Sequence, residues 1–130
     1  MTPDIIIKTG LKYIGTPYVF NAPTLQTDSF DCSSFIQYIF SINGIPMPRN
    51  SRQQYEIGKR VAFNKKKKGD LLFFSTTSRR KKKGIHRIGH VAIYVGNNKM
   101  LHTYRQGKKV QISTINTYWR SVLIGVKRVL

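Results

Sequence analysis

The order of secondary-structure patterns along the chain constrains its fold more than any other feature. Helix-like periodicity comes first, and strand-like alternation dominates from about residue 71 onward. We predict helices from Thr2 to about Ile14, from Cys32 to Asn43 and from Ser51 to Ile57, with a helical turn at Ile115–Trp119. We predict strands at Leu71–Ser75, Gly89–Val95, Lys99–Arg105, Val110–Ile112 and Val122–Val129. This order favours an α+β fold, with the N-terminal helices packed on one face of an antiparallel β-sheet. At 130 residues and without an internal repeat, the chain (1–130) is expected to be a single domain.

The only cysteine, Cys32, lies in FDCSSF, where a polar loop becomes an apolar helical stripe. Asp31 is a good N-cap, which places Cys32 at the first helical position, where the helix dipole favours a thiolate. The stripe that follows does not require the sulfur, since it consists of Phe35, Ile36, Ile39 and Phe40. Most free cysteines are buried and inert, so a purely structural role is the alternative. The capped position favours a nucleophile whose sulfur faces a cleft.

Two of the three histidines, His90 and His102, lie in neighbouring strand-like segments, GHVAIYVG and KMLHTYR. The sequence Gly-Asn-Asn at 96–98 signals a hairpin between them. A two-residue turn formed by the two asparagines alone would put the imidazoles on opposite sides of the sheet. A three-residue loop over 96–98, with Asn98 left-handed, pairs Ala92 with His102 and makes the histidines diagonal neighbours, roughly 7 Å apart between backbones. We predict the second register.

Together, Cys32, His90 and His102 supply a nucleophile, a base and a group that orients the base. In this interpretation, His102 fixes which ring nitrogen of His90 faces the sulfur. Either histidine alone is more simply a polar strand residue, whereas the three residues together favour catalysis. His86 lies in a basic loop without periodicity and is expected to be solvated. The spacing of the cysteine and histidines matches no usual structural zinc site, so neither a metal nor another cofactor is predicted.

Five segments in a fixed order resemble the NlpC/P60 family of bacterial cell-wall cysteine peptidases: FDCSS, PRNS, KKGDLLFF, GHVAIYVG and MLHTY. The resemblance runs from about Gly15 to Trp119, and the linked order of the motifs makes it specific. It implies a papain-like fold and hydrolysis of peptidoglycan stem peptides, typically between the γ-carboxyl of D-glutamate and diaminopimelate or lysine. Matched position by position, Cys32 is the nucleophile, His90 the general base and His102 the orienting residue.

The resemblance also implies which residues line the cleft. Tyr18, in GTPYVF, matches a tyrosine that can polarise the scissile carbonyl, and its alternative is an aromatic core residue. Asp31 and Ser33 flank the nucleophile and are expected to cap the helix and shape the cleft. Arg49 and Ser51, in PRNS, match a segment that lines the substrate groove, where a guanidinium suits a carboxylate-bearing peptide. The alternative for both is a turn and helix start.

The chain departs from the family pattern at three places, of which the first, at Ser34, is expected to leave the helix entry intact. Ser34 stands where a glycine is common, and Phe20-Asn21-Ala22 replaces a frequent glycine pair. The basic stretch 78–87 is longer than the usual connection between its flanking strands. The resemblance therefore leaves open the detailed shape of the cleft and its substrate preference.

The chain carries 23 basic and 5 acidic residues, a formal net charge of +18, much of it at Lys65–Lys68 and Arg79–Lys83. Such a surface attracts polyanions, and in a Gram-positive wall teichoic acid phosphates are the expected partner. A rival interpretation is a basic polyanion- or nucleic-acid-binding module with an incidental cysteine. Because the aromatic residues mostly lie in apolar periodic segments, we do not expect nucleic acid to be the main partner. A third interpretation is a papain-like acyltransferase that keeps the triad and changes the acceptor.

The N-terminal sequence MTPDIIIKTG lacks the basic and apolar regions of a secretion signal, and no stretch approaches the ~20 apolar residues of a membrane span. We expect a monomeric domain of an exported protein, located in the cell wall or outside the cell. A cytoplasmic enzyme of muropeptide recycling is the alternative.

Overall fold

The computed structural model describes residues 3–105 and 108–130. Within these residues the α-helices are α1 (Pro3–Leu11), α2 (Cys32–Ser41), α3 (Ser51–Tyr55) and α4 (Thr117–Ser121), and the 3-10 helices are η1 (Phe63–Lys65) and η2 (Gly84–Arg87). The strands are β1 (Lys59–Val61), β2 (Leu71–Ser75), β3 (Ile88–Gly96), β4 (Lys99–Tyr104), β5 (Lys109–Thr114) and β6 (Leu123–Arg128). The helix-first, sheet-second order predicted from the sequence is confirmed.

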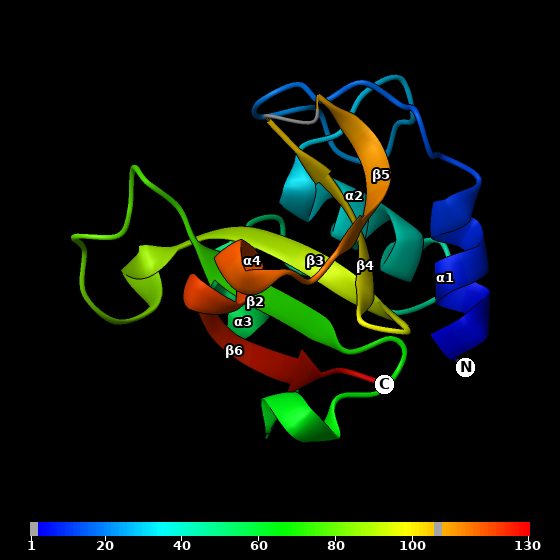
Figure 1. Cartoon of the computed structure of the whole chain (residues 1–130). Helices are drawn as coiled ribbons and strands as arrows, with labels where there is room; N and C mark the ends of the chain where they lie inside the picture. Colours follow the sequence, from blue (N-terminus) through cyan, green and yellow to red (C-terminus); the bar gives the residue numbers. More distant parts are fainter. Residues whose placement is uncertain (1–2, 106–107) are drawn as a thin grey trace.

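The strands form one antiparallel sheet in the order β1-β6-β2-β3-β4-β5 (Figure 1). The N-terminal helices pack on one face of it, as predicted, and the short α4 lies on the opposite face. The fold is therefore α+β. The start of α2 and the start of β3 come together through a contact between Cys32 and Gly89, which defines the region described below.

Two apolar clusters lie on the two faces of the sheet. The stripe of α2 is fully buried against alternate residues of β2 and β3, with Phe35, Ile36, Ile39 and Phe40 facing Leu71, Phe73, Val91 and Ile93. The intervening strand residues form the second cluster with α4: Leu72, Phe74, Ala92 and Trp119. Because both faces of β2 and β3 are covered, the middle of the sheet is rigid enough to hold side chains in fixed positions.

The β3–β4 hairpin has the predicted register but not the predicted turn. Ile93 pairs with Leu101, a register that places Ala92 opposite His102. At the turn, however, Gly96 pairs with Lys99, and the two asparagines between them are both left-handed, with φ of 52° and 58°. The three-residue loop is therefore wrong: the chain makes a two-residue turn. A β-bulge between Tyr94 and Gly96 then shifts the pairing by one residue, and this bulge keeps both histidines on one face.

Element boundaries differ mainly at helix ends. The strand Leu71–Ser75 is confirmed in full, whereas α1 and α2 end at Leu11 and Ser41, earlier than predicted. The predicted helix start at Thr2 lies outside the described residues. Strand β1 was not predicted because its sequence, Lys-Arg-Val, shows no alternation, and it forms by pairing with β6 at the sheet edge. Within the described residues, no helix has the length and apolar character needed to cross a membrane.

Candidate active site

Helix α2 begins at Cys32 because Asp31 closes a capping box. The Asp31 carboxylate accepts a hydrogen bond from the backbone N–H of Ser34 at 2.8 Å, and the Ser34 hydroxyl accepts one from the backbone N–H of Asp31 at 2.9 Å. The predicted cap is confirmed. The first N–H groups of the helix, at Cys32 and Ser33, have no carbonyl partner within the helix, so they are available beside the sulfur.

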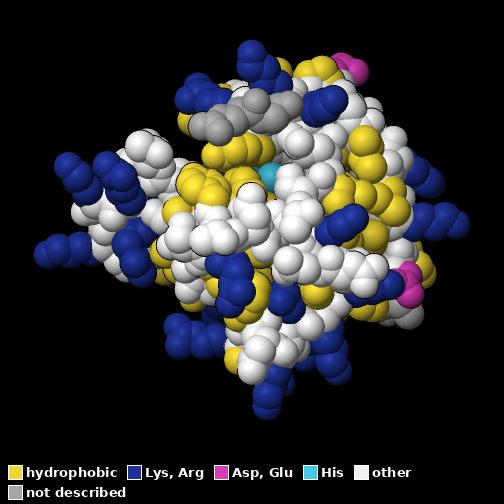
Figure 2. Space-filling view, viewed as in Figure 1, with side chains coloured by type: hydrophobic (Ala, Val, Ile, Leu, Met, Phe, Trp, Pro, Cys, Tyr) yellow, Lys and Arg dark blue, Asp and Glu magenta, His cyan; other side chains and the backbone are white. Residues whose placement is uncertain are grey.

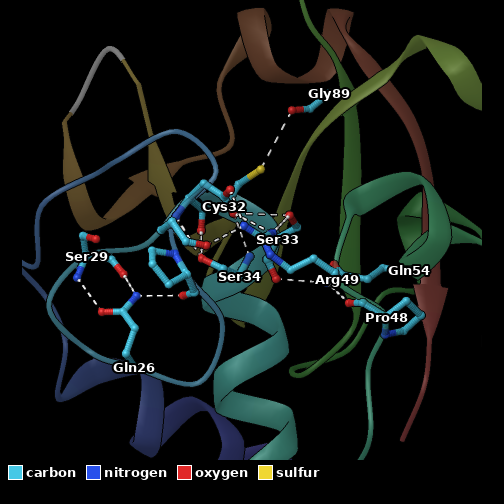
Figure 3. A network of polar contacts seen from close by, with 12 residues as sticks. Gln26, Ser29, Cys32, Ser33, Ser34, Pro48, Arg49, Gln54 and Gly89 are labelled. Carbon is cyan, nitrogen blue, oxygen red and sulfur yellow. Dashed lines mark hydrogen bonds and ion pairs between the residues drawn. The ribbon is translucent and has the colours of Figure 1, made fainter.

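Arg49 is fixed against the start of α2 (Figure 3). Its Nη1 donates to Asp31 Oδ1 at 3.1 Å and to the Ser33 hydroxyl at 3.0 Å. Its Nη2 donates to Asp31 Oδ2 and to the Ala22 carbonyl, both at 2.8 Å. This bidentate pair uses both terminal nitrogens of Arg49 inside the protein. Its contacts therefore fit a structural role better than that of a free ligand for a substrate carboxylate.

The segment that carries Arg49 is attached to α2 by a residue that was not predicted. Gln54 is fully buried, and its Nε2 donates to the carbonyls of Ser33 at 3.0 Å and Pro48 at 2.9 Å. Ser51, one of the residues predicted to line the cleft, lies buried at the start of α3. One sequence signal pointed to this anchoring role: Gln54 follows Ser51 by three residues and so lies on the same face of the helix.

The two buried histidines and Ser113 form a chain of hydrogen bonds on the sheet, which we call the relay. His90 Nε2 lies 2.8 Å from His102 Nδ1, and His102 Nε2 lies 2.8 Å from the Ser113 hydroxyl. The predicted contact between the imidazoles is confirmed. If Nε2–H of His90 donates to His102, then Nδ1 of His90 carries a lone pair and can accept a proton. The opposite tautomer would leave His90 Nδ1 protonated and useless as a base.

Ser113 was missed by sequence reasoning for a definite reason. It lies on β5, where Gln111 pairs with His102, so Ser113 is its diagonal neighbour on the same sheet face. That position depends on the β4–β5 register, and the segment joining the two strands contains no turn motif that fixes it. A serine hydroxyl can accept a hydrogen bond from His102, which makes it a suitable end for the relay.

An aromatic group encloses His90 and His102. The rings of Phe74, Tyr104 and Trp119 lie with centroids 5.9, 5.2 and 5.4 Å from that of His90. Burial lowers the pKa of His90 well below 6.5, and neighbouring His102 lowers it further. Burial likewise lowers the pKa of His102 to about 4. Both imidazoles are therefore neutral in the free protein at neutral pH.

The thiol of Cys32 is also neutral in the free protein. Its Sγ is 3.8 Å from the carbonyl oxygen of Gly89, to which the S–H donates. Burial first, and then the Asp31 carboxylate, raise the pKa of Cys32 to about 11, although the backbone N–H groups of Val91 and Ser33 oppose the change. The thiolate expected from the helix start is therefore wrong for the resting protein. A neutral thiol becomes a nucleophile only when a base removes its proton.

A neutral resting thiol has a measurable consequence. We expect the rate of alkylation of Cys32 by iodoacetamide in the free protein to rise about tenfold per pH unit from pH 6 to 9, because the thiolate fraction does so below a pKa of about 11. Cys32 is the only cysteine, so the intact mass reports this site alone. A fast rate that stays constant over this range would instead indicate a resting thiolate–imidazolium pair.

Cys32 and His90 line one pocket of about 530 Å³. The pocket is also lined by all five residues that were predicted to line the cleft: Tyr18, Asp31, Ser33, Arg49 and Ser51. His102 lies behind His90. Tyr18 is half-buried, and burial, followed by the negative charges of a Cys32 thiolate and of Asp31, raises its pKa to about 12. Its hydroxyl therefore remains protonated near neutral pH and can donate a hydrogen bond to a substrate oxygen.

The third histidine lies apart from this site. His86 is exposed in η2, as predicted. In the part of the chain that the structure describes, no group of three or more histidine, cysteine, aspartate or glutamate side chains is arranged to hold a metal ion.

Known proteins resemble this chain over nearly its whole length. Gamma-D-glutamyl-L-lysine dipeptidyl-peptidase of Bacillus subtilis (strain 168) is 38% identical over 98% of the chain. Gamma-DL-glutamyl hydrolase of the same strain is also 38% identical over 98% of the chain. The chain spans 41% of the first relative and 30% of the second.

Solved structures also match this chain over nearly its whole length. An NlpC/P60 family protein from Bacillus cereus matches with a TM-score of 0.88 at 34% identity, over 100% of this chain and 41% of that one. RipD from Mycobacterium tuberculosis, described as a non-catalytic NlpC/p60 domain protein adapted to peptidoglycan binding, matches with a TM-score of 0.79 at 28% identity, over 98% of this chain and 97% of that one. The model of the NlpC/P60 family matches residues 15–128. The chain belongs to the NlpC/P60 family.

Proposed function

We propose that this domain is a cysteine endopeptidase that hydrolyses peptidoglycan stem peptides at the bond between the γ-carboxyl of D-glutamate and diaminopimelate or lysine. The observation that carries the proposal is the relay from His90 through His102 to Ser113, whose His90 end lines the same pocket as Cys32. The γ-D-glutamyl specificity follows the name of the first Bacillus subtilis relative, a gamma-D-glutamyl-L-lysine dipeptidyl-peptidase, and the second is named as a hydrolase of gamma-DL-glutamyl bonds. Family membership alone would not suffice, since RipD is described as non-catalytic.

The mechanism starts from Cys32 and His90, which line the same pocket. His90 Nδ1 accepts the proton of the Cys32 thiol as the sulfur attacks the amide carbonyl. The resulting oxyanion is stabilised by the N–H groups at the start of α2 and by the Tyr18 hydroxyl. The imidazolium of His90 then protonates the leaving amine, and a thioester with Cys32 remains. The same imidazole removes a proton from water, which attacks the thioester and releases the free carboxylate.

His102 acts in this mechanism as a positioning residue. We expect the substitution His102→Ala to lower kcat more than tenfold with little change in KM, because His90 can then adopt the unproductive tautomer. His102→Asn should recover part of the loss, since an amide oxygen accepts the same hydrogen bond from His90. Steady-state kinetics of the three proteins checks this. Equal losses in both variants, or a loss confined to KM, would contradict the positioning role.

The strongly basic surface supports a second contact, with anionic polymers of the wall such as teichoic acid. Lysine and arginine side chains project from most of the visible surface, whereas acidic ones are few (Figure 2). Such charge retains a protein near polyanions and weakens with salt. This supports a location in the cell wall or outside the cell. The Cys32→Ala protein should keep its salt-sensitive affinity for teichoic acid while losing cleavage.

The proposal is tested with soluble peptidoglycan fragments of known stem composition. Each fragment is incubated with the protein before and after alkylation of Cys32, and the products are identified by mass. Hydrolysis predicts a free γ-D-glutamyl carboxylate and a released amine, both abolished by alkylation. A product ligated to an amine would indicate an acyltransferase. Binding without any cleavage of these fragments would favour the non-catalytic alternative.

A further inference from the structure

The pocket around Cys32 contains more positive charge than its own contacts use. Its charged lining residues are one carboxylate, Asp31, and four guanidiniums, Arg49, Arg52, Arg79 and Arg105. The carboxylate is bound to Arg49. The other four acidic residues of the chain, all within the described residues, do not line the pocket. Three guanidiniums therefore face the space where a substrate binds without an acidic partner there.

Arg52 and Arg79 lie on the same side of this space. Arg52 Nη1 donates to the carbonyl of Ile88 at 2.8 Å, and Arg79 Nη1 donates to the carbonyl of His86 at 3.2 Å. The two acceptors are the backbone carbonyls of His86 in η2 and of Ile88, the first residue of the strand β3 that carries His90. Each contact uses Nη1 and leaves Nη2 and Nε for another acceptor. The two guanidiniums are thus anchored, with donors still available.

Arg52 lies within electrostatic reach of both Arg79 and the sulfur. Partial burial lowers the pKa of Arg52, and the positive charge of Arg79 lowers it further, whereas a negative charge at Cys32 would raise it. Two like charges held together at a partly buried site repel each other. An anion placed between them removes that repulsion and gains charge-assisted hydrogen bonds.

We propose that Arg52 and Arg79 form a carboxylate-binding subsite, which selects substrates with a free carboxylate on one of the two residues that the scissile amide joins. This rests on the proposed function, because a γ-glutamyl linkage leaves the α-carboxylate of glutamate free. A leaving residue such as diaminopimelate supplies a second carboxylate, which lysine within a stem peptide lacks. The hydroxyl-bearing segment Thr76–Ser78, which lines the same side of the pocket, provides further donors.

Four substrates distinguish the two sources of the carboxylate. The glutamate bears either an α-carboxylate or an α-carboxamide, and the leaving residue is either diaminopimelate or lysine. We expect wild-type kcat/KM to fall about tenfold or more when the selected carboxylate is removed, with most of the change in KM, because a charged hydrogen bond is lost. A loss with the α-carboxamide identifies the glutamate carboxylate as the one that is bound. A loss with lysine identifies the carboxylate of diaminopimelate.

The variants Arg79→Gln and Arg52→Gln should abolish that preference, so that carboxylate and neutral substrates react at similar rates. Arg79→Glu should reverse it. Arg80→Gln is the matched control, since Arg80 is an exposed neighbour that does not line the pocket. Equal losses on charged and neutral substrates, or an unchanged preference in both Gln variants, would overturn the subsite.

A binding measurement separates this proposal from the proposed function. The same four peptides are titrated against Cys32→Ala protein with and without Arg79→Gln, and their Kd values are compared. Carboxylate-dependent binding that disappears in the double variant supports the subsite even where wild-type protein cleaves nothing. Binding that is equal for charged and neutral peptides refutes the subsite even where wild-type protein cleaves all four.

Discussion

Replacing His90 with alanine is expected to lower kcat/KM by about 10³-fold or more at neutral pH. The reason is that the pKa of the Cys32 thiol is raised to about 11, and His90 is the only imidazole among the described residues that line the pocket. The defect should shrink as the pH rises, because hydroxide then removes the proton directly. Measuring kcat/KM of both proteins from pH 6 to 10 checks the size of the loss and how it changes with pH.

The chain offers a matched control for this experiment. His86 is the one exposed histidine of the three, and His86→Ala should leave both the rate and its pH dependence unchanged. Circular dichroism of each variant verifies that the sheet is intact. If His90→Ala retained most of the wild-type rate at neutral pH, His90 would not be the base.

The largest effect on stability is expected for Asp31→Ala. This change removes the side-chain cap of α2 and leaves Arg49 without its carboxylate. Losing a cap costs about 1 kcal/mol, and unpairing a partly buried arginine adds about 2 kcal/mol after allowance for solvent, since the Arg49 side chain is 30% exposed. For a domain of this size, a total of about 3 kcal/mol lowers Tm by about 10 °C, which differential scanning calorimetry measures directly.

Two further variants separate the contributions at Asp31. Asp31→Asn keeps an oxygen that can cap the helix and removes the charge, so its loss should be intermediate. Asp28→Ala removes an exposed acidic residue of the same loop and should change the stability by less than about 0.5 kcal/mol. An Asp31→Ala protein as stable as Asp28→Ala would show that the pair with Arg49 contributes nothing.

The elements with strong local signals were predictable from the sequence. The α2 stripe and its cap follow from side-chain period and from the chemistry of Asp31, and β2 follows from its continuous apolar run. The turn of the β3–β4 hairpin was not predicted correctly. It is one residue shorter than expected, and a bulge at Tyr94–Gly96 restores the expected pairing of the strands. Two errors in loop geometry thus cancelled, and the predicted contact between His90 and His102 was correct.

The parts of the site that depend on tertiary contacts could not be predicted in the same way. Ser113 and Gln54 reach the site through strand register and through backbone carbonyls, which leave no motif. The protonation states also differed from expectation. Helix position alone favours a thiolate at Cys32, but burial outweighs it and raises the pKa.

Trapping the acyl-enzyme tests whether Cys32 is the nucleophile. An N-acylated γ-D-glutamyl p-nitrophenyl ester is mixed with the protein, acid-quenched within the first turnover, and analysed by intact and peptide mass. An ester acylates faster than it deacylates, so an acyl-enzyme accumulates. We expect one acyl group on the peptide that contains Cys32, and none in Cys32→Ala protein. Release of p-nitrophenol by wild-type protein with no acyl group on Cys32, or at the same rate in Cys32→Ala protein, would contradict this role.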